Sequence, residues 1–153
     1  MIRKTVFSLV SFVLFVHASA GHATARDYDV RDFGAVGDGV TLDTEAIQAA
    51  IDKCAAEGGG RVVLAGGRVY LSGGVVLRSN VTLSIDAGSV LRGSLDKDDY
   101  PDITPKLPYL YTERFTRQLI YAERERNIGI AGQGTIDGQG FRRTGCSSGT
   151  SGT

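Results

Sequence analysis

The sequence contains few of the residues that most often build catalytic, metal or disulfide sites. Among its 153 residues are two histidines, two cysteines, three prolines and no tryptophan. His17 and His22 lie in or just after the first apolar run, so we expect no catalytic histidine. Cys54 falls in a helical apolar pattern and Cys146 in a polar tail, so a disulfide between them stays open but is not the expectation. The sequence assigns no catalytic, cofactor-binding or metal-ligating residue.

An excess of one charge is also lacking, since 17 basic residues balance 17 acidic ones. This balance argues against a nucleic-acid partner and against attraction to an anionic membrane surface. Glycine is abundant, with 21 residues, but it has no three-residue period, which excludes collagen and favours a chain with many tight turns. The 42% apolar and 22% charged residues are typical of an ordinary globular domain.

Residues 1–25 have the pattern of a signal peptide. Two basic residues precede an apolar run at 6–16 that is too short to span a bilayer, and small residues follow it. Cleavage is expected after Ala20 or Ala25. The pattern predicts a secreted or periplasmic protein with no membrane span after removal of the signal.

Residues Thr44 to about Glu57 form the one clear helical pattern. Apolar residues recur there at i, i+3, i+4 and i+7, the spacing of a single buried stripe, at Ile47, Ala50, Ile51 and Cys54. Asp43 is the expected N-cap, and Leu42 has the spacing of a hydrophobic staple with Ile47. Glycines 58–60 should end the helix. We expect Cys54 to be a small core residue.

After the helix, short runs rich in Val, Ile and Leu predict strands. They are too short and too β-branched for helices, and no Asn-Gly or Asp-Gly pair joins them as hairpins. The runs are 62–64, 69–71, 75–77, 81–85, 90–91 and 119–121.

One internal repeat indicates a solenoid of stacked coils. Residues 79–83 resemble residues 126–130, and their asparagines, Asn80 and Asn127, lie 47 residues apart. That distance fits two coils of about 20 to 25 residues each. An asparagine at such a turn tolerates the left-handed conformation and can bond its own backbone.

Between residues 94 and 117 the strand pattern lapses. This insert carries all three prolines and several aromatic residues, at Tyr100, Tyr109, Tyr111 and Phe115. Two interpretations stay open: the insert contacts a ligand, or its aromatic residues only hold the loop against the stack.

Three segments look like known functional motifs but lack the neighbouring residues that those motifs require. Residues 32–34 read Asp-Phe-Gly but lie near the N-terminus without the other kinase motifs. Glycines 34, 37 and 39 have the wrong spacing for a dinucleotide loop, and no Walker lysine follows them. Residues 132–137 supply a single calcium-type nonapeptide where tandem copies are needed.

Two groups of segments resemble known families. The first group, 32–39 (DFGAVGDG), 43–44 and 46–51, resembles the N-terminal cap of pectin lyase-like β-helix proteins, although Leu42 stands where that pattern usually has a second aspartate. The second group resembles the first coils of glycoside hydrolase family 28, the polygalacturonases. Its segments are 73–83 (GGVVLRSNVTL), 88–91, 99–101, 119–122 and 134–140 (GTIDGQG).

This resemblance implies an all-β fold: a right-handed parallel β-helix with a short N-terminal capping helix, present here as an incomplete solenoid over residues 26–141. Residues 142–153 form a polar Gly/Ser/Thr tail without a strand-like run. We therefore expect the reading frame to be lost or the gene truncated near Phe141.

The family chemistry implied is hydrolysis of galacturonan in pectin with inversion, by paired aspartates about 6.5–9.5 Å apart. The family's Asn-Thr-Asp, Asp-Asp, Gly-His-Gly and Arg-Ile-Lys motifs are not found in their expected context, so we expect the chain alone to be inactive. Asp98 and Asp99 form a pair, but in the insert, where we expect them to be solvated. Asp137 is expected to bond its own turn.

Two other functions stay open. In one, the chain is a carbohydrate-binding module whose insert aromatics stack on sugar rings while basic side chains meet uronate carboxylates, at Lys97, Lys106, Arg114 and Arg117. In the other, it is a structural β-helix of the tailspike kind. A polysaccharide is the expected partner of the full-length protein, with no cofactor.

Overall fold

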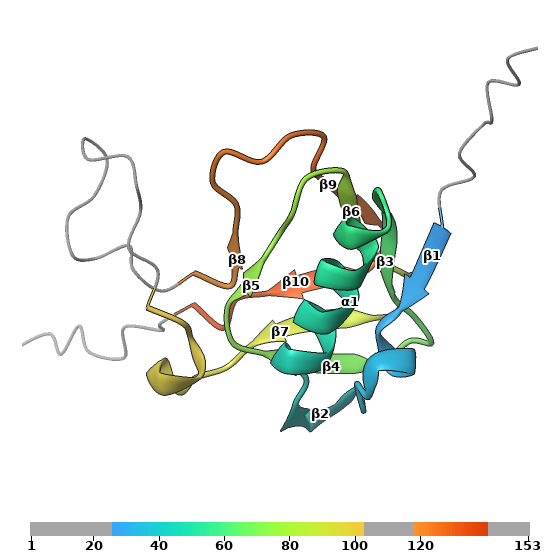
Figure 1. Ribbon diagram of the computed structural model, residues 1–153. Helices are drawn as coiled ribbons and strands as arrows, with labels where there is room; N and C mark the ends of the chain where they lie inside the picture. Colours follow the sequence, from blue (N-terminus) through green and yellow to red (C-terminus); the bar gives the residue numbers. More distant parts are fainter. Residues whose placement is uncertain (1–25, 103–117, 141–153) are drawn as a thin grey trace, which may run out of the picture.

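A computed structural model describes residues 26–102 and 118–140 (Figure 1). The expected signal peptide, the polar tail and Cys146 lie outside these residues and remain predictions. The elements in chain order are β1 (Arg26–Asp29), η1 (Val30–Phe33), β2 (Asp38–Leu42), α1 (Thr44–Ala56), β3 (Gly60–Leu64), β4 (Val69–Ser72), β5 (Val75–Val76), β6 (Val81–Ile85), β7 (Val90–Gly93), η2 (Lys97–Asp99), β8 (Ile120–Tyr121), β9 (Gly129–Gly132) and β10 (Thr135–Asp137).

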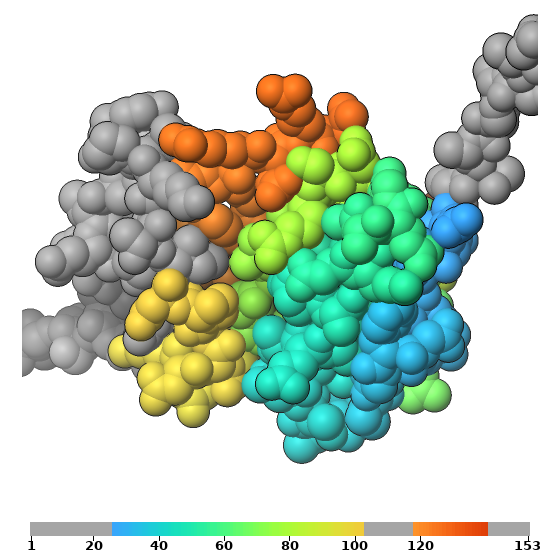
Figure 2. Space-filling model, in the orientation of Figure 1, coloured from blue at the N-terminus to red at the C-terminus, as the bar shows by residue number. Residues whose placement is uncertain are grey.

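The strands form three parallel sheets. Sheet A has the order β1-β3-β6-β9, sheet B the order β2-β4-β7-β10, and sheet C contains β5 and β8. Each turn of the chain visits the three sheets in succession and then returns one level further along, for example from β4 through β5 and β6 to β7. This path is a parallel β-helix, as the sequence predicted, with α1 packed against its N-terminal coils (Figures 1 and 2).

The prediction of two coils between the repeated asparagines is wrong. Thr82 in β6 pairs directly with Gly129 in β9, so the 47-residue spacing corresponds to a single coil. The preceding coil is much shorter, since Gly60 pairs with Val81 only 21 residues later. The difference lies between β7 and β8, which are separated by residues 94–119, whereas β4 and β5 of the preceding coil are separated only by residues 73–74.

The two asparagines have the predicted left-handed conformation but use their side chains differently from the prediction. Asn80 has a φ of 64° and Asn127 a φ of 53°. The Asn127 amide Nδ2 donates to Asn80 Oδ1 at 3.0 Å, which links adjacent coils instead of the residue's own backbone. The positions of the two asparagines are confirmed. We call the hydrogen bond between their side chains, which joins adjacent coils, the asparagine rung.

Helix α1 buries the apolar stripe that its sequence predicted. Ile47, Ala50, Ile51 and Cys54 have no exposed surface and join the core side chains of the coils. Burial raises the pKa of the Cys54 thiol. Cys54 is therefore confirmed as a small core residue, and within the described part of the chain it forms no disulfide.

The N-terminal end of α1 differs from the prediction. Asp43 occupies the cap position, but its carboxylate makes no capping bond. It accepts instead from the backbone N–H groups of Val36 at 2.7 Å and Gly37 at 3.0 Å, so this nearly buried carboxylate closes the preceding loop. The predicted staple is also wrong, because Leu42 is 43% exposed and lies outside the core cluster.

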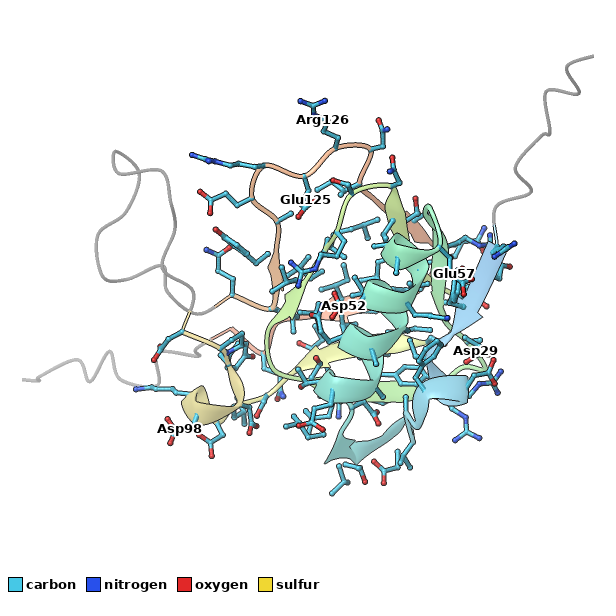
Figure 3. All side chains as sticks on the ribbon, viewed as in Figure 1. Asp29, Asp52, Glu57, Asp98, Glu125 and Arg126 are labelled. Carbon is cyan, nitrogen blue, oxygen red and sulfur yellow. The ribbon has the colours of Figure 1, made fainter. Side chains whose placement is uncertain are left out.

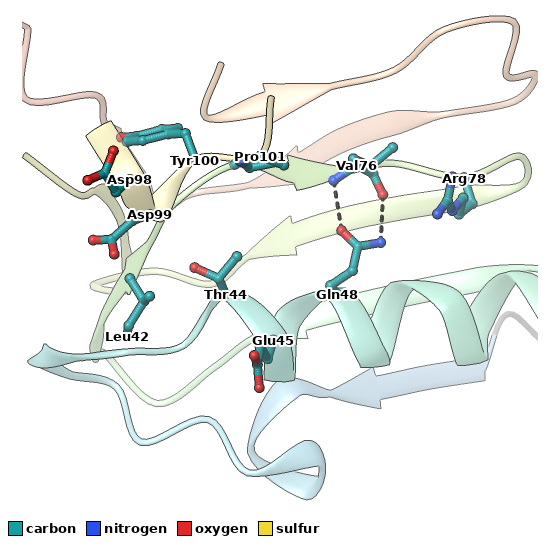
Figure 4. Close-up of a pocket in the computed structure, with 11 residues that line it drawn as sticks. Leu42, Thr44, Glu45, Gln48, Val76, Arg78, Asp98, Asp99, Tyr100 and Pro101 are labelled. Carbon is teal, nitrogen blue, oxygen red and sulfur yellow. Dashed lines mark hydrogen bonds between the residues drawn. The ribbon is translucent and has the colours of Figure 1, made fainter. Parts of the chain in front are cut away.

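A second, polar stripe on α1 completes the edge of sheet C. It consists of Thr44, Gln48 and Asp52. Gln48 bonds both backbone groups of Val76, accepting from its N–H at 2.8 Å and donating to its carbonyl at 3.1 Å (Figure 4). Thr44 accepts from the N–H of Gly73, and Arg78 donates to Asp52. Because a parallel edge strand leaves such groups unpaired, the stripe does the work of a missing neighbouring strand.

The opposite end of the stack has less cover within the described residues. Leu83 and Leu91 are fully buried, but their register partners one coil later, Ile130 and Ile136, are 53% and 44% exposed. These isoleucines continue the two inward-facing columns of the core. In residues 26–102 and 118–140, no helix has the length and apolar character needed to cross a bilayer.

Glu57 connects the end of α1 to β1 and gives a prediction for acid stability. Its carboxylate accepts from Lys53, Tyr28 and Arg26, and these contacts, led by Lys53, lower its pKa from 4.5 to about 2 (Figure 3). A lowered folded-state pKa stabilises the fold above pH 4.5, and this contribution is lost as the pH falls towards 2.

Glu57→Gln should therefore show a smaller fall in melting temperature between pH 5 and about 2 than the unchanged protein. Thermal melts across this range measure the effect, with Glu45→Gln as the control at an exposed carboxylate of the same helix. Parallel pH profiles for the unchanged protein and Glu57→Gln would contradict the prediction.

Candidate functional site

The insert leaves the stack at the end of β7 and folds back on it at once. Asp96 accepts from the N–H of Asp98 and so begins η2. The Tyr100 hydroxyl then donates to the carbonyl of Ser94 at 2.8 Å, and burial raises the pKa of this phenol. Tyr100 therefore holds this part of the insert against the stack, while Tyr109, Tyr111 and Phe115 lie outside the described residues.

Two cavities share Tyr100 as a wall. The first cavity, of about 510 Å³, lies between the start of α1, β5 and the insert (Figure 4). Glu45, Asp98 and Asp99 are among its lining residues, together with Arg78. Since Arg78 is already paired with Asp52, the ionised groups of this cavity are mainly negative. Such a wall repels an anionic sugar.

The aspartate pair in the insert matches its prediction in part. Asp98 is exposed, as expected. Asp99 is half-buried and accepts a hydrogen bond from the Ser94 hydroxyl, so its carboxylate helps to hold the insert. Both lie at the end of η2 rather than on a strand, which is consistent with their dismissal as a catalytic pair.

The second cavity, of about 300 Å³, lies where the insert meets the turn after β10. Its side chains come from Ser94, Leu95, Lys97, Tyr100, Leu119 and Gln139. Among the described residues of this lining, Lys97 is the one with a charged side chain, so this part of the second cavity is basic where the first cavity is mainly acidic. Lys97 was predicted as a carboxylate ligand, while Lys106, Arg114 and Arg117 lie outside the described residues.

Two residues of this cavity were missed by sequence reasoning. Gln139 and Leu119 are remote from Lys97 along the chain and reach the same cavity through strand pairing. Gln139 follows β10, which pairs with β7, and Leu119 precedes β8, which pairs with β5. An alignment of successive coils in the other two sheets could have predicted both residues. The single asparagine repeat aligns the coils only in sheet A.

Asp137 lies beside the second cavity and has the role predicted for it. Its carboxylate accepts from the N–H of Gln139 at 3.0 Å, which closes the turn after β10. Arg92 approaches the same carboxylate at 3.7 Å. Across the described ranges, no three acidic, histidine or cysteine side chains are grouped as metal ligands would be.

The three parallel sheets, the asparagine rung and the helical cap define a pectin lyase-like right-handed parallel β-helix. Residues 28–98 match the family model described as rhamnogalacturonase A/epimerase, pectate lyase-like. The exo-poly-α-D-galacturonosidase of Dickeya chrysanthemi is 36% identical over 129 residues, which cover 80% of this chain and 21% of that protein.

A solved structure extends the comparison to the fold. The family 28 exopolygalacturonase of Yersinia enterocolitica is 42% identical with a TM-score of 0.63, over 76% of this chain and 21% of that one. The resemblance to the polygalacturonases of glycoside hydrolase family 28 is thereby confirmed. The chain spans about a fifth of the length of these relatives.

A third relative matches over a much shorter stretch. The mannuronan C5-epimerase AlgE5 of Azotobacter vinelandii is 68% identical over 38 residues, or 25% of this chain and 4% of that protein. High identity in so short a stretch indicates a shared structural element more than shared chemistry.

Proposed function

We propose that this chain forms the capped N-terminal end of an exported glycoside hydrolase that cleaves galacturonan-type pectin. The observation that carries the proposal is the extent of the galacturonosidase match, which covers 80% of the chain and not the cap alone. The predicted signal at residues 1–25 supports export to the periplasm or the exterior.

The described residues fit the role of scaffold better than that of catalyst. Inverting hydrolysis needs one carboxylic acid to protonate the leaving oxygen and a carboxylate to activate water from the opposite side. Asp137 is occupied by its turn and by Arg92, and Asp38 accepts from the backbone N–H groups of Val40 and Thr41. On this proposal the catalytic aspartates lie in further coils, which would stack on the exposed face at Ile130 and Ile136.

An exchange chimera tests this proposal. The part of the Yersinia exopolygalacturonase that matches this chain is replaced by residues 26–140, and release of reducing sugar from polygalacturonate is measured. We expect activity, because the three sheets can continue in register into the enzyme's own coils. The truncated enzyme without any replacement is the control and should be inactive. A chimera that is folded by circular dichroism but inactive would contradict the proposal.

Epimerisation of a polyuronate is the second candidate, favoured by the 38-residue match to AlgE5. It has less support because that match covers a quarter of the chain, whereas the galacturonosidase match covers four fifths. The two functions give different products from the native protein's substrate: a hydrolase releases reducing ends, and an epimerase leaves the chain length unchanged.

A further inference from the structure

The walls of the second cavity are held in place from both sides. The Tyr100 hydroxyl donates to Ser94, and the Gln139 amide Nε2 donates to the carbonyl of Gly93 at 2.5 Å. Both anchors lie at the end of β7, within two consecutive residues. A side chain at Gly93 would leave no room for this arrangement, since its Cβ would lie 2.8 Å from the Tyr100 hydroxyl oxygen. The cavity is thus built on the rigid stack and not on the insert alone.

Charge separates this cavity from its neighbour. The first cavity presents three carboxylates beside the paired Arg78, whereas the described lining residues of the second include Lys97 and no acidic residue. The acidic residues near Lys97 already have partners or line the first cavity. Asp96 caps η2, and Asp98 lines the first cavity. Asp99 also lines the first cavity and accepts from the Ser94 hydroxyl, and Asp137 accepts from the N–H of Gln139 beside Arg92. An anionic ligand is therefore favoured on one side of Tyr100 and disfavoured on the other.

We propose that the second cavity binds one uronic acid residue of an anionic polysaccharide. Lys97 pairs with the sugar carboxylate, and Tyr100 and Leu119 pack against the apolar face of the ring. The volume of about 300 Å³ suits a single hexuronate unit and lies at the lower end for ligand pockets. This inference rests on the proposed function, which supplies a polyuronate as substrate.

Calorimetric titration of the purified chain with trigalacturonate tests the inference. We expect Lys97→Met to weaken binding about tenfold or more, because a hydrogen-bonded charge pair is lost. Lys97→Arg should retain most of the affinity. The matched control is Arg126→Met, which removes an exposed cation far from η2 (Figure 3) and should leave the affinity within about twofold. Uncharged galactotriose should bind about as weakly as trigalacturonate binds the Lys97→Met variant.

Several outcomes would overturn the inference. These are no binding of trigalacturonate, equal losses in Lys97→Met and Arg126→Met, or galactotriose binding as tight as trigalacturonate. Because Lys97 is exposed, unchanged thermal melts should exclude misfolding of the variants. An active chimera without trigalacturonate binding to this chain removes the subsite and leaves the proposed function standing. An inactive chimera together with Lys97-dependent binding of trigalacturonate keeps the subsite and removes the proposed function.

Discussion

Gly59→Ala is expected to destabilise the protein by more than about 3 kcal/mol, and Gly58→Ala by about 1 kcal/mol. Both glycines follow α1 with left-handed φ angles, 97° at Gly58 and 103° at Gly59, so both substitutions carry a similar conformational cost. They differ in what a Cβ would meet. At Gly59 it would lie 2.4 Å from the Asn80 carbonyl oxygen, whereas at Gly58 no atom lies within 4 Å.

The contact at Gly59 cannot be relieved by a side-chain rotation, because the obstacle is the backbone of the next coil. The same Asn80 carbonyl accepts the N–H of Gly60 at 3.0 Å, so moving Asn80 away also weakens the start of the β3–β6 pairing. Urea denaturation of the two variants measures the difference. Equal losses at Gly58 and Gly59 would show that the close approach to Asn80 does not exist in solution.

Gln48→Leu is expected to cost about 2–4 kcal/mol. Leucine has a similar size and a good helix propensity, so the expected loss comes from the backbone N–H and carbonyl of Val76, which the substitution leaves without their partners. Each unpaired group in a partly buried setting costs about 1–3 kcal/mol.

Chemical denaturation and hydrogen exchange at the Val76 amide measure this prediction, with exchange expected to be faster in the variant. Gln48→Glu is an informative second variant: it keeps an acceptor for the Val76 N–H but loses the donor to the carbonyl. Glu45→Gln, at an exposed position one turn earlier, is the control and should be nearly neutral. Unchanged stability and exchange in Gln48→Leu would mean that α1 does not complete the edge of sheet C.

Elements with a local pattern could be predicted from the sequence. The stripe of Ile47 and Ile51 gave α1, and β-branched runs gave the strands from β3 to β8. Strand β1 was missed because Arg26–Asp29 has no apolar run: its pairing comes from β3, where Arg26 lies opposite Gly60. A strand that is stabilised mainly by pairing with its neighbour has few strand-favouring residues of its own, so its sequence does not predict it.

The coil count and the role of Asp43 were beyond the sequence for a related reason. A spacing of 47 residues is compatible with two short coils or with one coil and an insert, and only the β6–β9 register separates them. Asp43 has the residue type and position of an N-cap. Its carboxylate accepts from the N–H groups of Val36 and Gly37 instead of from the N–H groups of the first helical turn. Both errors concern partners that local sequence does not specify.

The candidate site was half predictable. Lys97 and Tyr100 stand out as basic and aromatic residues of the insert, which sequence reasoning had already marked as a place for ligand contact. Gln139 reaches the same cavity through the pairing of β7 with β10, and Leu119 through the pairing of β5 with β8. The contrast in charge between the two cavities follows from side-chain placement and could not be read from residue order.

The central claim is that this chain is the capped first part of a polygalacturonase-type β-helix, with its catalytic residues in later coils. The most direct test compares reducing-sugar release from polygalacturonate by the purified chain alone and by the exchange chimera in the same assay. The account predicts no release by the chain and clear release by the chimera. Turnover by the chain itself, or none by a folded chimera, would contradict it.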